Sequence, residues 1–168
     1  MTIEILYASE TCTSEMLSYD LESVAKEYAD CRVRNMDQVK PEDISPGTLY
    51  VMLVSTHGDG ELPIPGELFA SKIRKEDPDY TGVLFAVFGL GDTVYEATYN
   101  WGCKTVADLM TQRNATLLGE IGLHDASELD EPEDIAVPWL TDILDTLARD
   151  EQNAAPQAHE HVASLSSL

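Results

Sequence analysis

The sequence predicts an α/β fold, a doubly wound five-stranded parallel sheet with helices on both faces. Two observations predict it: short aliphatic runs recur along the chain, and stretches with helical periodicity lie between them. Alternating strands and helices favour a parallel sheet, because right-handed crossovers then place helices on both of its faces.

Five runs rich in aliphatic residues are the expected strands of this sheet. They are Ile3–Tyr7, Arg32–Met36, Leu49–Val54, Val83–Phe88 and Thr116–Leu118, of which Arg32–Met36 is the weakest.

Three segments have the apolar periodicity of helices that pack on a sheet, namely Thr13–Tyr28, Trp101–Arg113 and Pro132–Arg149. The expected stripe of the first is Leu17, Leu21, Val24 and Tyr28, and that of the third is Ile135, Trp139, Ile143 and Leu147. Trp101 is expected to pack in the core.

The length of 168 residues suits one domain, which we expect over residues 1–149. Residues 150–168 are rich in Ala, Gln, Ser and His and have little to bury, so they are expected to form a disordered tail.

The charge balance is strongly acidic, with 31 Asp and Glu residues against 10 Lys and Arg and a net charge of -21. Such a surface repels nucleic acid and anionic membranes and attracts basic faces of partner proteins. The alternative is that the acidity only maintains solubility.

Two further features bear on the compartment. No apolar run reaches the roughly 18 residues that span a bilayer, and the first residues lack the features of a leader. Three cysteines without metal-site spacing indicate reduced thiols. We expect a cytoplasmic monomer without a bound metal.

The loop after the first strand combines hydroxyl side chains with a helix N-terminus. Such a loop suits a phosphate monoester, since hydroxyls, backbone N–H groups and the helix dipole all favour an anion. It contains neither a Walker motif nor G-x-G-x-x-G. The alternative is that Thr11 or Thr13 merely caps the helix. The candidate binding residues are Ser9, Glu10, Thr11, Cys12, Thr13 and Ser14.

The loop after the third strand holds two glycines in three positions, which let the backbone turn sharply against a flat ligand. A plain turn is the alternative. The candidate binding residues are Ser55, Thr56, His57, Gly58, Asp59 and Gly60, with His57 beside the ligand.

The loop after the fourth strand carries aromatic residues. A tyrosine there can cover the flat ring of a bound ligand and add about 1 kcal/mol of stacking energy. The candidate binding residues are Leu90, Gly91, Asp92, Tyr95, Tyr99 and Asn100.

Taken together, the three loops resemble the three FMN loops of the flavodoxin family. The motifs that carry the resemblance are Ser9-x-Thr11-x-x-Ser14, the run from Ser55 to Glu61 and Phe-Gly-Leu-Gly-Asp-x-x-Tyr. The resemblance covers residues 3–148 and is to short flavodoxins of the MioC type and to FMN domains of diflavin reductases such as the sulfite reductase flavoprotein. It implies FMN as cofactor, with its phosphate at Ser9–Ser14, one flavin edge at Ser55–Gly60 and Tyr95 stacked on the ring. It also implies that Asp125 lies near the flavin.

Cys12 departs from the family, which has glycine at this position. A Cβ there costs roughly 1–2 kcal/mol if the backbone is left-handed, and FMN affinity would then fall.

The resemblance implies an electron carrier between a reductase and an acceptor protein, since the sequence shows no nucleophile triad or general base. Two alternatives stay open: a flavin-free binding module that acts through its acidic surface, and an FMN-dependent reductase that uses nicotinamide directly. A response-regulator reading is set aside, because Ser9 and Ser55 occupy the positions that require acidic residues.

Overall fold

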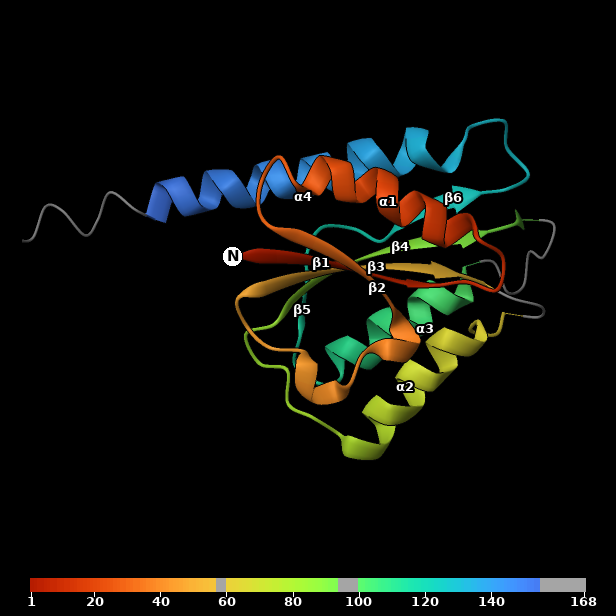
Figure 1. Cartoon of the computed structure of the whole chain (residues 1–168), viewed down its shortest axis with the longest axis horizontal. Coiled ribbons are helices and arrows are strands. Elements are labelled where there is room, and N and C mark those ends of the chain that lie inside the picture. Colours follow the sequence, from red (N-terminus) through yellow and green to blue (C-terminus); the bar gives the residue numbers. More distant parts are fainter. Residues whose placement is uncertain (57–59, 94–99, 155–168) are drawn as a thin grey trace, which may run out of the picture.

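A computed structural model of the chain describes residues 1–56, 60–93 and 100–154. Within these ranges a parallel sheet lies between two helical layers, with α1 and α4 on one face and α2 and α3 on the other (Figure 1). The strands are β1 (Thr2–Ala8), β2 (Cys31–Asn35), β3 (Thr48–Ser55), β4 (Leu84–Gly91), β5 (Thr116–Leu117) and β6 (Gly122–Asp125). The helices are α1 (Thr13–Ala25), α2 (Ile64–Glu76), α3 (Trp101–Thr111) and α4 (Pro132–Ala154), with 3₁₀ turns η1 (Met36–Gln38) and η2 (Pro41–Asp43).

The strand order is β2-β1-β3-β4-β5, and all pairs are parallel. β6 pairs with β4 at Phe88–Gly91, beyond the short β5 ladder at Leu84 and Phe85. The fifth position of the sheet is therefore divided between β5 and β6, and β6 was not among the expected strands. The doubly wound arrangement is confirmed, and the strand order reverses between β1 and β3.

The central strands are buried on both faces, which explains their continuous apolar runs. Along β3, Tyr50, Met52 and Val54 belong to the core beneath α2 and α3. Leu49, Val51 and Leu53 belong to the core beneath α1 and α4.

The expected stripe on α1 is correct only in its first half. Leu17, Leu21 and Ala25 are buried, whereas Val24 is half-buried. Tyr28 is 37% exposed, because α1 ends at Ala25 and this side chain turns toward α4. Its hydroxyl donates a hydrogen bond to Asp145 Oδ1 at 2.6 Å.

The stripe on α4 is rotated from the expected one. The buried residues are Ala136, Leu140, Ile143 and Leu144. Ile135 is 36% exposed, while Trp139 and Leu147 pack only at the margin of the core. The helix also continues to Ala154, so the segment expected to be a tail from residue 150 begins as helix.

Two other expectations differ from the structure. Trp101, the first residue of α3, is 51% exposed and not in the core. Helix α2 was not expected, although it buries Phe69, Ala70 and Ile73 at helical spacing. Among the described helices, none has the length and apolar character needed to cross a membrane.

Candidate functional site

The carboxyl ends of β1, β3, β4 and β6 meet at one edge of the sheet, beside the reversal of strand order between β1 and β3 (Figure 1). Ligands of open α/β sheets bind at such an edge. The three predicted loops follow β1, β3 and β4, so the fold brings their described residues to the same edge.

The first loop is closed on itself by Ser9. Its hydroxyl donates to Thr11 O and accepts a hydrogen bond from Thr11 N at 3.2 Å. Cys12 is the N-cap residue of α1, and no side chain in the described part of the chain caps this helix. The alternative that Thr11 or Thr13 serves as a cap is therefore wrong.

Exposure divides the six residues of this loop. Glu10, Thr11, Cys12 and Thr13 are exposed and Ser9 is half-buried, whereas Ser14 is fully buried. The hydroxyls of Ser14 and Ser55 are 2.6 Å apart, so this contact joins the first loop to the end of β3. Glu10 Oε1 accepts a hydrogen bond from Ile64 N at 3.4 Å, which ties the loop to the start of α2.

Thr56 connects the second loop to the third. Its N–H donates to Leu90 O at 2.9 Å, and its hydroxyl oxygen accepts from Gly102 N, in the first turn of α3, at 3.3 Å. Gly60 has a φ of +100°, a conformation that favours glycine. His57, Gly58 and Asp59 lie outside the described residues.

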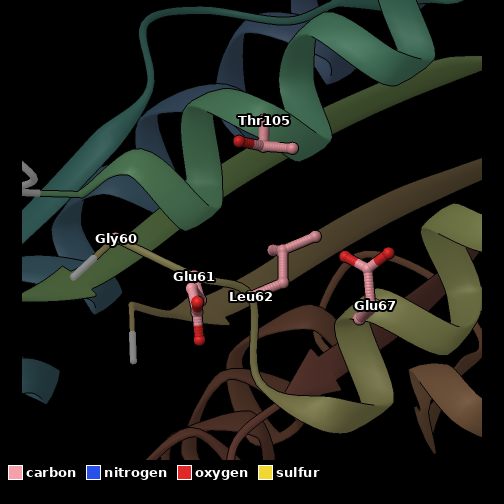
Figure 2. Close-up of a pocket in the computed structure, with 5 residues that line it drawn as sticks. All are labelled: Gly60, Glu61, Leu62, Glu67 and Thr105. Carbon is pink, nitrogen blue, oxygen red and sulfur yellow. The ribbon is translucent and has the colours of Figure 1, made fainter. Parts of the chain in front are cut away.

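A hollow of about 390 Å³ lies beside the second loop, between α2 and α3 (Figure 2). It is lined by Gly60, Glu61, Leu62, Glu67 and Thr105. No residue of the first or third loop is among these five, and two of them are acidic. The described lining of this hollow therefore comes from the second loop, α2 and α3.

The third loop begins with residues held by their backbone. The Leu90 side chain is buried with α1 and α4, so only its backbone is presented to this edge. Gly91 O accepts a hydrogen bond from Ala126 N at 2.8 Å, and Asp92 is half-buried. Tyr95 and Tyr99 lie outside the described residues, and their flavin contacts stay predictions.

Asn100 lies beneath this loop. It is fully buried with a φ of +54°, and its amide oxygen and nitrogen find no hydrogen-bond partner in the described structure. A Cβ added to Gly91 would lie 2.8 Å from Asn100 Oδ1, so glycine permits this close packing. Asn100 therefore occupies a second layer below the predicted binding surface.

Asp125 ends β6 and holds the third loop from its other side. Its Oδ1 accepts from Thr93 N at 3.0 Å, Ser127 N at 2.9 Å and Ser127 Oγ at 2.8 Å. Desolvation acts to raise the pKa of this carboxyl, but the hydrogen bonds from Thr93 and Ser127 outweigh it and hold the pKa well below its usual range. Asp125 is therefore ionised at neutral pH.

Two residues that hold the site were missed from the sequence. Gly102 approaches the end of β3 so closely that an added Cβ would lie 3.0 Å from Ser55 O. Ser127 bonds to Asp125 and to the hydroxyl of Thr93. The Asp-x-Ser spacing is a local turn pattern that could have indicated Ser127, whereas nothing in the sequence marked Gly102.

The first loop matches the chemistry of a phosphate monoester. It combines exposed hydroxyl side chains with the uncapped N-terminus of a 13-residue helix. A helix N-terminus attracts anions through its N–H groups and dipole. The described residues of the first loop therefore fit a phosphate group at the carboxyl end of β1.

Comparison with known proteins defines the class. The family model for flavodoxin matches residues 5–139, so the chain belongs to the flavodoxin family. FMN is the cofactor of this family.

Individual relatives and solved structures agree with membership of the flavodoxin family. The NADPH-dependent diflavin oxidoreductase 1 of Schizosaccharomyces pombe is 32% identical over 150 residues, covering 87% of this chain and 26% of that protein. The MioC homologue of Haemophilus influenzae is 29% identical over 105 residues, covering 62% of this chain and 71% of that protein. A cysteine-to-serine mutant of flavodoxin from Pseudomonas aeruginosa superposes with a TM-score of 0.72 and 26% identity, over 88% of this chain and 99% of that one.

The relatives differ in length from this chain. The chain spans 21% of the diflavin oxidoreductase of Emericella nidulans and 26% of that of S. pombe. It matches nearly the whole of the P. aeruginosa flavodoxin.

Proposed function

We propose that this chain binds FMN at the carboxyl edge of its sheet and carries electrons between a reductase and an acceptor protein. The observation that carries the proposal is the meeting of three hydrogen-bonded loops beside the β1–β3 reversal, with a hydroxyl-rich, phosphate-type loop that has no Lys or Arg among them. When bound, FMN supplies the redox chemistry, and the protein supplies binding and electrostatics.

The chain's own residues have separate tasks in this proposal. The hydroxyls of Ser9, Thr11 and Thr13 and the N–H groups at the start of α1 would hold the phosphate. The backbone from Ser55 to Gly60, and that of Gly91 and Asp92, would border the flavin. These contacts are consistent with the edge position of the loops.

Basic residues are distributed unevenly between the two edges of the sheet. The helices run antiparallel to the strands, so basic residues in or just after the last turns of α1, α2 and α3 lie at the edge opposite the site; these are Lys26, Arg74, Lys75 and Arg113. The site edge carries many carboxylates, including Glu10, Glu15, Glu61, Asp92, Asp125, Glu128, Asp130, Glu131, Glu133 and Asp134. Lys104, in the first turn of α3, is an exception.

This distribution supports a partner with a basic face. A cluster of carboxylates around the site steers such a partner so that it approaches the flavin edge first. We propose that both the reductase and the acceptor dock in this way, without nucleic acid or membrane as partner.

We also propose that the protein is a cytoplasmic monomer. The cysteines Cys12, Cys31 and Cys103 are free, which suits a reducing compartment. Size-exclusion chromatography with light scattering tests the oligomeric state.

The function is tested by reconstituting the protein with FMN and following electron transfer by stopped flow. A separate NADPH-dependent flavoprotein reductase should reduce the holoprotein, which should then reduce a basic cytochrome. The isolated chain should not oxidise NADPH. NADPH oxidation would favour a stand-alone reductase, and absence of flavin uptake would favour a flavin-free binding module.

A further inference from the structure

The connection between the ends of β4 and β6 continues beyond the sheet. The ladder pairs Gly91 with Asp125, and Ala126 N then donates to Gly91 O at 2.8 Å. Beyond this hydrogen bond, the hydroxyls of Thr93 and Ser127 are 2.8 Å apart. The first residues of the third loop are therefore fixed to the segment that follows β6.

Asp125 stands at the centre of this connection. One oxygen of its carboxylate, Oδ1, accepts hydrogen bonds from three atoms: Thr93 N, Ser127 N and Ser127 Oγ. The bond to Thr93 is the one that spans the two segments, since Ser127 lies on the same segment as Asp125. A single acceptor oxygen at residue 125 is therefore enough to make all three hydrogen bonds.

We infer that Asp125 is a positioning residue that sets the third loop against the flavin, and that it does so as a hydrogen-bond acceptor and not through its negative charge. The inference rests on the proposed FMN site. An asparagine has the same shape and keeps a carbonyl acceptor, whereas an alanine leaves Thr93 N without this partner.

Asp79 offers a matched control at the opposite edge of the sheet. Its Oδ1 also accepts three hydrogen bonds, from Thr81 N at 3.0 Å, Thr81 Oγ1 at 2.7 Å and Asn114 Nδ2 at 3.0 Å. It lies in the connection between α2 and β4, before the amino end of β4, whereas the three loops follow the carboxyl ends of β1, β3 and β4. Asp79→Ala removes the same kind of contact and the same charge without touching the site.

The test compares Asp125→Ala, Asp125→Asn and Asp79→Ala by FMN titration of the apoprotein and by amide hydrogen exchange of Thr93. Asp125→Ala should weaken FMN binding about tenfold and expose the Thr93 amide to exchange, in line with the loss of one hydrogen bond that leaves its donor unpaired. Asp125→Asn should stay within about threefold of wild type and keep Thr93 protected. Asp79→Ala should leave both quantities unchanged.

Equal losses of affinity in Asp125→Asn and Asp125→Ala would assign the effect to charge and overturn the inference. Unchanged affinity in Asp125→Ala would overturn it as well. If Asp125→Ala does not fold, Asp125→Asn decides alone: affinity close to wild type supports the acceptor role, and a tenfold loss contradicts it. Failure of the wild-type protein to bind FMN would instead refute the proposed function, while Thr93 exchange would still report the contact.

Discussion

Cys12 occupies the N-cap position of α1 with a φ of -50° and a ψ of 1°. These angles lie on the right-handed side of the φ/ψ map, where a Cβ causes no strain. The penalty that would follow from a left-handed backbone at this position therefore does not arise. The cysteine is compatible with the phosphate-loop conformation, even though the family has glycine there.

Replacement of Cys12 tests this directly. Cys12→Gly should leave the dissociation constant of FMN within about twofold, because no strain is relieved by removing the Cβ. Isothermal titration calorimetry measures the change. A gain of tenfold or more would show that the thiol does obstruct the loop.

The thiols of Cys12 and Cys103 should differ strongly in reactivity. Cys12 is exposed, whereas Cys103 is buried and donates to Asn100 O at 2.9 Å. Burial raises the pKa of Cys103 to about 11, so its thiolate is scarce at neutral pH. Disulfide-exchange labelling at pH 8 should modify Cys12 rapidly and Cys103 only on unfolding, and bound FMN should protect Cys12.

The same burial makes stability depend on alkaline pH. The folded-state pKa of Cys103 lies above its ordinary value of 9.0, so the unfolded state loses its proton first. The free energy of unfolding should fall as pH rises from 9 toward 11, and Cys103→Ala should reduce this dependence. Urea denaturation across that pH range measures it.

Residue roles at the site were only partly predictable from the sequence. The positions of Ser9, Thr56, Gly91 and Asp125 at one edge follow from motif and strand order. The hydrogen-bond partners of their polar atoms do not follow from motif and strand order, because hydrogen bonds between loops depend on strand register. Thus Thr56 and Asp125, predicted as flavin contacts, have contacts that hold neighbouring loops.

At the scale of elements, the packing of α4 against β6 shows why the apolar stripe was misplaced. Trp139 turns sideways, its ring centroid 5.2 Å from that of Phe88, and its Nε1 donates to Glu120 O at 3.0 Å. Gly122 makes this arrangement possible, since an added Cβ would lie 3.0 Å from Trp139 Cε2 and closer still to the Phe88 ring. Periodicity identifies a helix, but such a glycine contact sets its rotation on the sheet.

Gly122→Ala should therefore destabilise the protein by about 1–3 kcal/mol through overpacking of Phe88 and Trp139. Urea denaturation gives the free energy of unfolding. Adding Phe88→Leu to this variant should recover part of the loss, because a smaller side chain makes room for the methyl group. Strictly additive losses would contradict the proposed contact.

On the scale of the whole molecule, a net charge of -21 affects two binding events in opposite directions. The phosphate of FMN is an anion that approaches an acidic protein, and the described residues of the first loop provide no Lys or Arg. A basic partner protein is attracted to the same edge. Added salt screens both interactions.

Raising the ionic strength from about 20 mM to about 300 mM should tighten FMN binding severalfold and slow electron transfer to a basic cytochrome. Riboflavin, which lacks the phosphate, should show little salt dependence and serves as the control. Titrations and stopped-flow traces at matched salt concentrations give both trends. If added salt raised both FMN affinity and the electron-transfer rate, or lowered both, the proposed role of the net charge would be contradicted.

The central claim is that a hydroxyl-rich loop without Lys or Arg, at the carboxyl edge of the sheet, holds the phosphate of FMN. Titration of folded apoprotein into FMN, followed by flavin fluorescence, tests it most directly. The account predicts saturable quenching at one FMN per chain, with riboflavin bound at least about tenfold more weakly because it lacks the phosphate contacts. Absence of saturation with FMN up to about 100 μM, in protein shown to be folded by circular dichroism, would contradict it.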